Sequence, residues 1–136
     1  MRLALDEARQ GDFPFGAVIV RDAEVIARGA NMGRRLDDPT AHGEMQAIRH
    51  GLAEHGSAAL RGATLYTPAT PLCHVHGRDH LVPFRPPGLC GIGRPTGTKI
   101  NQIMVPCAEI SAKSPFAPIS ITGGVLADEA MSLFGK

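Results

Sequence analysis

The strongest constraint on the fold is a proline- and glycine-rich segment in the middle of the chain. Residues 68–97 hold six of the eleven prolines and five of the sixteen glycines, and no apolar period of a strand or a helix persists there. Because proline removes a backbone donor from helices and sheets, regular elements are expected mainly before and after this segment. Long structureless loops are uncommon inside a compact domain, so the segment itself is anomalous.

The rest of the composition is that of one globular domain. The 136 residues, 43% hydrophobic and 20% charged, predict a single domain over residues 1–136 with one active site. The sequence has no apolar run long enough to span a membrane. Residues 1–10 include Asp6 and Glu7 and lack a signal-peptide cleavage site, so we expect a cytoplasmic protein without a membrane partner.

Charge and cysteine content narrow the function classes. A formal net charge of +1 is small for a protein whose main task is to neutralise phosphates, so a nucleic-acid partner is not expected. The odd number of cysteines, Cys73, Cys90 and Cys107, favours thiols or metal ligands over a disulfide framework. Cys107 lies among apolar residues, and we expect it to be a small buried hydrophobic side chain.

Apolar spacing predicts helices and strands on both sides of the anomalous segment. Before it, we expect a helix over 1–10, a hairpin over 17–27, a helix over 41–56 and a strand over 63–67. The apolar face predicted for the helix from residue 41 consists of Met45, Ile48, Leu52 and Ala53. After the segment, we expect helical spacing over 100–107, a strand or turn over 119–125 and a helix over 126–134.

A histidine and a glutamate two residues apart open the helix predicted from residue 41. His42 and Glu44 fall in its first turn, where both side chains can reach the space beyond the helix N-terminus. An imidazole there can bind Zn²⁺, and a carboxylate held off the metal can carry a proton from water to a leaving amine. Taken alone, the pair also fits a solvated helix start whose Glu44 complements the helix dipole.

The segments around this pair resemble one enzyme superfamily. They are PFGAVIV (14–20), Asn31, DPTAHGEMQAIR (38–49) and LRGATLYT (60–67). Together they are similar to the cytidine and deoxycytidylate deaminases, and within them to the bacterial guanine deaminase and nucleoside deaminase branch, which tRNA adenosine deaminases also resemble. One departure is Gly43, where the family usually has alanine.

The resemblance implies a fold, an activity and site residues. The fold would be a three-layer α/β/α domain with a central five-stranded mixed sheet, forming a homodimer. The activity would be zinc-dependent hydrolytic deamination of a small amino-purine base or nucleoside, with release of ammonia. His42 would be a zinc ligand and Glu44 the proton shuttle. The substrate would be bound by the Asn31 side chain, the Ala41 backbone and Phe15 as a pocket wall.

The second motif of the family departs strongly in this chain. Where the family has Glu-Pro-Cys-x-x-Cys, residues 70–76 are TPLCHVH. In one interpretation, Cys73 and His76 replace the two thiolate ligands, a combination that zinc accepts. In the other, residues from about 70 to 97 are a translation in the wrong reading frame, because skipping one base in a back-translation from Pro71 can give PCAMCMGAIIW.

Three functions therefore remain open from the sequence. The first is the small-molecule deaminase. The second is a tRNA adenosine deaminase or a cytosine or cytidine deaminase, of which the tRNA enzyme would need a basic groove. The third is a catalytically inert protein of deaminase fold, which follows if the segment around 70–97 folds as printed without a metal. Zinc content separates the enzymes from the inert protein.

Overall fold

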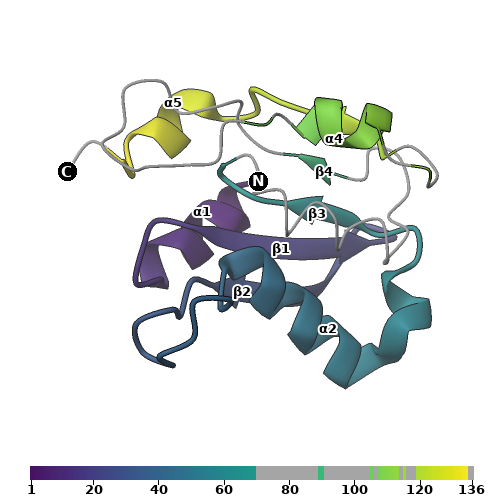
Figure 1. The fold of residues 1–136 in the computed structure, drawn as a ribbon, viewed down its shortest axis with the longest axis horizontal. Coiled ribbons are helices and arrows are strands. Elements are labelled where there is room, and N and C mark those ends of the chain that lie inside the picture. The colour runs from purple at the N-terminus through teal and green to yellow at the C-terminus, as the bar shows by residue number, and fades with distance from the viewer. Residues whose placement is uncertain (70–88, 91–104, 106, 114, 116–118, 135–136) are drawn as a thin grey trace.

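The structure is a computed structural model that describes residues 1–69, 89–90, 105, 107–113, 115 and 119–134. In these ranges the helices are α1 (Arg2–Gln10), α2 (Gly43–Leu60), α4 (Cys107–Lys113) and α5 (Ala127–Met131). The strands are β1 (Gly16–Arg21), β2 (Glu24–Ala30), β3 (Thr64–Tyr66), β4 (Leu89–Cys90) and β5 (Ile121–Thr122). Figure 1 shows α1 and α2 beside the hairpin of β1 and β2, with α4 and α5 toward the opposite end of the sheet.

The strands form one mixed sheet in the order β2-β1-β3-β4-β5. Strand β1 is antiparallel to β2 and β3, whereas β3, β4 and β5 pair in parallel. The α/β class predicted from the resemblance is confirmed. Strands β4 and β5 contribute two residues each, and residues 70–88 and 91–104 lie outside the described part, so the extent of the complete sheet stays a prediction.

The hairpin predicted over 17–27 is confirmed. Its strands β1 and β2 extend beyond the apolar residues on which the prediction was based. Asp22 and Ala23 have φ angles of 50° and 66°, the left-handed conformations that a tight two-residue hairpin turn requires. Arg21 pairs with Glu24 next to this turn, and Gly16 pairs with Ala30 at the far end of the ladder. The hairpin therefore reaches from the turn to the residue directly before Asn31.

Helix α2 lies against this hairpin through small residues. A Cβ added to Gly29 would come within 2.3 Å of the Ala47 nitrogen, and one added to Gly43 would lie 2.8 Å from the Gly16 Cα. Such distances are shorter than real carbon contacts allow, so the close approach depends on glycine. Gly43 is therefore accounted for by packing of the helix start against β1.

The close approach also corrects the predicted apolar face of α2. The buried side of the helix includes Glu44, Ala47, Ile48 and Gly51, whereas Met45 and Leu52 are only half-buried and Ala53 is exposed. The helix also continues to Leu60 across a kink at Gly56, which has a φ of 74°. The prediction was right for Ile48, which is completely buried, and for Leu52, which packs against the core, and it was wrong for Met45 and Ala53. It weighted large apolar side chains, while the hairpin selects small ones where backbones touch.

The buried apolar side chains of the described residues form two clusters. The larger one joins the buried side of α2 to the central strands and to the start of α4, and it consists of Ala17, Ile19, Ala27, Ala47, Ile48, Leu60, Ala63, Leu65, Cys107 and Ile119. The smaller one joins Leu5 of α1 to Ala130 of α5. The prediction that Cys107 is a buried core residue is confirmed.

In the C-terminal third, the predictions for residues 119–134 are confirmed, whereas the helical spacing predicted over 100–107 meets a helix only at its last residue. Val105 is not helical, and α4 runs from Cys107 to Lys113. Strand β5 lies inside the predicted strand or turn over 119–125, and α5 lies inside the helix predicted over 126–134. Of the helical spacing predicted over 100–107, only Val105 and Cys107 are described. Within the described ranges, every helix is too short or too polar to cross a lipid bilayer.

Candidate active site

His42 is the residue on which α2 begins. It is the N-cap, in extended conformation with φ −67° and ψ 152°, and its carbonyl accepts a hydrogen bond from the Gln46 N–H at 2.9 Å. Its own N–H donates to the Thr40 carbonyl at 2.8 Å. The side chain is half-buried. The backbone therefore fixes His42 at the boundary between the preceding loop and the helix, and its role as a ligand stays a prediction.

Glu44 is a buried carboxyl in the first turn of α2. Only 4% of the residue is exposed. Burial raises the pKa of Glu44, while hydrogen bonds from its own backbone N–H and from Thr67 act in the opposite direction. The Thr67 hydroxyl donates to Oε1 at 3.1 Å. A buried carboxyl with a raised pKa suits a group that must both take up and release a proton.

The contact of Thr67 with Glu44 was not predicted from the sequence. Thr67 directly follows β3 and is completely buried. A signal was available, since Thr67 is two residues beyond Leu65 and side chains two apart in an extended chain share one face. Leu65 packs in the cluster with α2, so Thr67 faces the same helix. Its partner in that helix could be identified only from the structure.

Asn31 follows β2 and is held from both sides. Its backbone N–H donates to the Phe15 carbonyl at 2.9 Å, and its carbonyl accepts from the Asp12 N–H at 2.8 Å. The side-chain Oδ1 accepts the Gly33 N–H at 3.2 Å. The residue is 5% exposed. This bond uses one of the two acceptor lone pairs of Oδ1. The side-chain NH₂ group therefore has more hydrogen-bonding capacity left for a ligand than Oδ1 has.

The loop before α2 is tied together by Asp38. Its Oδ1 accepts both the Thr40 N–H and the Thr40 hydroxyl, at 2.8 and 2.6 Å. Arg49 lies 3.4 Å from the other oxygen of Asp38 and donates to the Thr40 hydroxyl oxygen. These bonds lower the pKa of Asp38, with the Thr40 hydroxyl as the largest cause. The motif residues around His42 thus form a preorganised turn.

The same loop engages both backbone groups of Ala41. Its N–H donates to the Asp38 carbonyl at 3.0 Å, and its carbonyl accepts the Met32 N–H at 2.9 Å. The predicted bond from the Ala41 backbone to a substrate ring would therefore use the second lone pair of the carbonyl. That bond stays a prediction.

Phe15 has an aromatic partner that the sequence did not suggest. Its half-buried ring packs against Phe134, with 5.5 Å between the ring centroids and 57° between the planes. The backbone of Phe15 also lies against Gly43, because a Cβ added to Gly43 would lie 2.9 Å from the Phe15 carbonyl oxygen. Phe15 therefore lies beside the start of α2, a position compatible with the predicted pocket wall.

The predicted ligands Cys73 and His76 lie outside the described residues. Within the described part of the chain, His, Cys, Asp and Glu side chains form no group of three that could hold a metal ion. The described residues supply one candidate ligand, His42, and one buried carboxyl, Glu44, at the same helix start. This donor set fits part of a zinc site, and the remaining ligands have to come from other residues.

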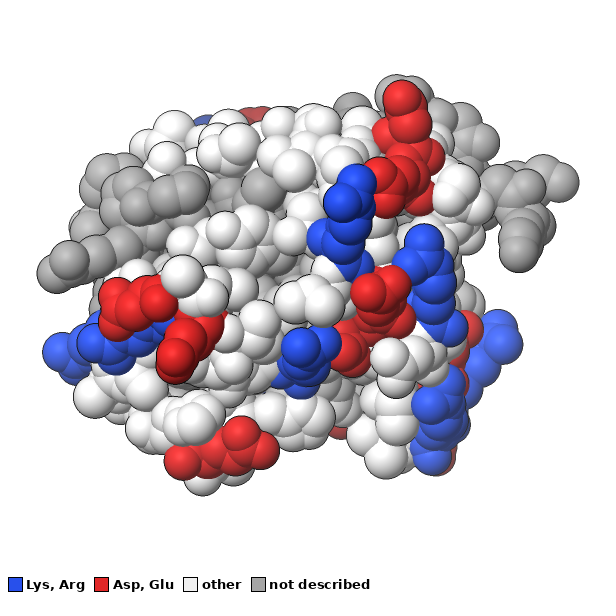
Figure 2. All heavy atoms as spheres, turned by 180° about the vertical axis from the view of Figure 1, so that it is seen from behind, with Lys and Arg blue, Asp and Glu red and all other residues white. Residues whose placement is uncertain are grey.

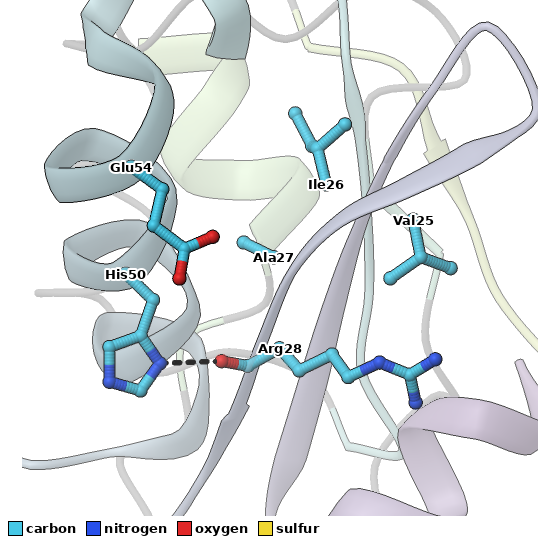
Figure 3. A pocket seen from close by; sticks show the side chains of 6 residues that line it. All are labelled: Val25, Ile26, Ala27, Arg28, His50 and Glu54. Atoms are coloured by element: carbon cyan, nitrogen blue, oxygen red, sulfur yellow. Dashed lines mark hydrogen bonds between the residues drawn. The ribbon is translucent and has the colours of Figure 1, made fainter.

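Two cavities of the described residues lie along β2. One, of about 280 Å³, is lined by Arg28, His50 and Glu54 among others. Figure 3 shows the His50 and Glu54 side chains on α2 beside β2, whereas the Arg28 side chain extends away from α2. The other, of about 520 Å³, shares Arg28 and His50 with it. Of the predicted site residues that the structure describes, none lines either cavity.

Histidines of α2 cover the free edge of the sheet beside these cavities. The His50 ring donates from Nδ1 to the Arg28 carbonyl at 2.8 Å, and the His55 ring donates from Nε2 to the Ile26 carbonyl at 3.0 Å. Both carbonyls belong to β2, the edge strand. Satisfying such groups protects an edge from pairing with other strands, so a structural explanation of these histidines is sufficient.

Charges on the described surface are largely paired. Residues 1–69 contain eight arginines and nine acidic residues. Six of the arginines lie within 3.6 Å of a carboxylate, namely Arg2, Arg9, Arg21, Arg28, Arg35 and Arg49. Figure 2 shows basic and acidic side chains interspersed on one face of the molecule. This face therefore presents no continuous basic surface.

Comparison with known families agrees with the resemblance. A profile of the cytidine and deoxycytidylate deaminase zinc-binding region matches residues 1–88. The tRNA-specific adenosine deaminase of Agrobacterium fabrum is 45% identical over 75 residues, which cover 52% of this chain and 49% of that protein. The guanine deaminase of Bacillus subtilis is 47% identical over 58 residues, covering 43% of this chain and 37% of that one.

Solved structures show the same fold over nearly the whole chain. A structure from studies of A-to-I editing by tRNA:A34 deaminases at the wobble position of transfer RNA matches with a TM-score of 0.79. The two chains are 30% identical, and the match covers 98% of this chain and 96% of the other. In sequence, the chain spans about half the length of the curated relatives it matches.

Proposed function

The chain belongs to the family of cytidine and deoxycytidylate deaminases that share a zinc-binding region, and from this premise we propose that it is a zinc-dependent hydrolase that releases an exocyclic amino group of a purine as ammonia. The observation that carries the proposal is the buried Glu44 carboxyl, two residues after His42 at the start of α2. The three-layer arrangement with a five-stranded sheet belongs to the same proposal.

In this proposal His42 binds the metal and Glu44 transfers the proton. Bound zinc supplies Lewis-acid activation of water. His42 would hold the metal together with ligands from the segment after β3, for which Cys73 and His76 are the candidates. Glu44 takes a proton from the attacking water and delivers it to the departing amine, a transfer for which its burial and raised pKa are suited.

A small amino-purine base or nucleoside is the proposed substrate. Asn31 is fixed beside the start of α2 and offers amide N–H groups for acceptors on a base edge. The paired arginines of residues 1–69 leave few cations for an extended phosphate contact. The relative named guanine deaminase acts, by its name, on such a base.

Adenosine in tRNA is the second candidate substrate. The match over 98% of the chain to a structure studied for editing by tRNA:A34 deaminases favours it, as do several relatives named tRNA-specific adenosine deaminases. Four basic residues and one acidic residue fall within residues 70–104, so the net charge of the described part does not describe the whole surface. In this alternative, the same Glu44 chemistry acts on a base presented by RNA.

Ammonia release from a substrate panel tests the proposal. Guanine, guanosine, adenine, adenosine, cytosine, cytidine and a tRNA anticodon stem-loop are incubated with the zinc-loaded chain. We expect turnover of a free purine base or nucleoside. Turnover of the stem-loop alone would replace the first candidate by the second, and turnover of no compound by a chain with bound zinc would contradict the deaminase function.

The identity of the remaining ligands needs its own measurement. The intact mass of the purified chain distinguishes the printed residues 70–97 from the shifted frame, because the two compositions differ. If the printed sequence is the physical one, we expect about one zinc per chain, and Cys73→Ser or His76→Ala should reduce the bound zinc. Absence of zinc from the unsubstituted chain would support the inert deaminase-fold protein.

The predictions on domain number, assembly and location belong to the same proposal. We propose a single domain over residues 1–136 that forms a homodimer in the cytoplasm. Sedimentation velocity of the purified chain measures the oligomeric state, and fractionation of the producing cells measures the location. A monomer at micromolar concentration would contradict the proposed dimer.

A further inference from the structure

Thr67, which follows β3, forms a hydrogen bond with the buried Glu44 of α2. The Thr67 hydroxyl donates to Glu44 Oε1 at 3.1 Å. Thr67 is 0% exposed and Glu44 is 4% exposed. Among the described residues, this is the one side chain that bonds the Glu44 carboxyl. The contact joins two elements that are separated by 23 positions in the sequence.

The backbone around Thr67 is held by the centre of the sheet. Strand β3 pairs with β1, where Leu65 lies opposite Ile19 and Tyr66 opposite Val18. The following residue, Pro68, is also fully buried. A hydroxyl on such a fixed backbone has a defined position, whereas a glutamate side chain has several rotatable bonds and loses its orientation easily. Thr67 is therefore the rigid member of the pair and Glu44 the member that needs to be held.

We propose that Thr67 is a positioning residue that sets the orientation of the Glu44 carboxyl for proton transfer. This inference rests on the proposed deaminase function. With Oε1 bound by the hydroxyl, the carboxyl has fewer orientations, and the other oxygen is left for the reacting groups. A proton-transfer group contributes most when its geometry is set before the reaction, so losing the hydroxyl should slow the chemical step.

The test compares three substitutions on β3 and its end. Thr67→Val replaces the hydroxyl by a methyl group of similar size, Thr67→Ser keeps the hydroxyl, and Thr64→Val makes the same chemical change three residues earlier. Thr64 is half-buried, with no hydrogen bond from its side chain among the described residues. For each variant, kcat and KM are measured with the best purine substrate, together with bound zinc and Tm.

We expect Thr67→Val to lower kcat by about ten- to a hundredfold, the range for one hydrogen bond to a charged group. KM and zinc content should stay near those of the unsubstituted chain. Thr67→Ser should restore most of kcat, and Thr64→Val should leave it unchanged. Rescue by serine separates positioning from a purely structural role, because serine keeps the hydroxyl and lacks the methyl group of threonine.

Two results would overturn the inference while the proposed function stands. One is an active chain whose Thr67→Val variant keeps its kcat, and the other is a Thr67→Ser variant as slow as Thr67→Val. An unsubstituted chain that binds zinc and turns over no substrate would overturn the proposed function and this inference together. The activity of the unsubstituted chain therefore shows which of the two statements has failed.

Discussion

Residues 1–69 and the described residues between 89 and 134 differ in the length of their helices and strands. The first region contains strands of six, seven and three residues and helices of nine and 18 residues. The described part of the second contains two strands of two residues and helices of seven and five residues. All described site residues, Phe15, Asn31, Ala41, His42, Glu44 and Thr67, lie in the first region.

The main core repeats this asymmetry. Eight of the ten buried residues in the larger cluster come from the first region, and the second contributes Cys107 and Ile119. The second region nevertheless reaches the site, because Phe134 packs against Phe15. The described residues of the second region thus extend the sheet by β4 and β5 and place Phe134 beside Phe15.

The largest effect is expected from the carboxyl at the centre of the first region. Glu44→Gln should reduce ammonia release by about 10²- to 10⁴-fold, because the amide cannot carry the proton. The fold and the bound zinc should be retained, since the substitution keeps the size and polarity of a side chain that lies next to the predicted ligand. Steady-state kinetics and metal analysis of the purified variant measure both effects.

The matched control for this substitution is on the same helix. Glu54→Gln makes the same chemical change at an exposed position of α2 and should leave turnover unchanged. Full activity of Glu44→Gln would remove Glu44 from the mechanism. Loss of zinc or of folding in that variant would show instead that the carboxyl has a structural role.

The second largest effect is expected on the free energy of unfolding, for which one substitution in each region is compared. Ile48→Ala removes a completely buried side chain of α2 and should lower the free energy of unfolding by about 2–5 kcal/mol. Ile121→Ala in β5 changes a residue that is 37% exposed, so the loss should be clearly smaller. Urea denaturation measures both, and equal losses would contradict the idea that the first region dominates stability.

The smallest effect is expected on the pH dependence of stability, through Asp12, whose backbone N–H binds the Asn31 carbonyl. The backbone N–H groups of Arg35 and Arg34 donate to Asp12 at 2.9 and 2.8 Å, and the Arg35 guanidinium donates at 2.7 Å. The backbone bond from Arg35 is the largest cause that lowers the pKa of Asp12 from its ordinary 3.8. Ionised Asp12 therefore stabilises the folded chain above pH 3.8, and this contribution disappears as the pH falls through the lowered pKa.

Asp12→Asn should remove this pH dependence. The variant should be less stable than the unsubstituted chain at pH 7, and the difference should shrink when the pH falls below 3.8. Urea midpoints of both chains at pH 7, 4 and 3 measure it. Asp22→Asn, at an exposed carboxyl in the hairpin turn, is the control, and a similar response of both variants would show that the Asp12 contacts contribute little.

Much of the first region was predictable because its local signals agree with one another. Helix α1, the hairpin and β3 follow from short-range spacing and turn residues. The position of His42 and Glu44 at the start of α2 was also predicted, and their chemical roles stay predictions. The face of α2 was misjudged, since it depends on where Gly29 of another element touches it. Thr67 was missed as a site residue for the same reason, because its partner is on α2.

The sequence by itself determined the family, the α/β class and the two residues at the start of α2. These depend on patterns local in the chain: periodicity, turn chemistry and the order of motifs. Only the tertiary structure decided that Glu44 is buried against Thr67, that Asn31 Oδ1 is engaged by Gly33, and that Phe134 covers Phe15. Such pairs join residues whose separation in sequence carries no period, so their contact depends on how the sheet and its helices pack together.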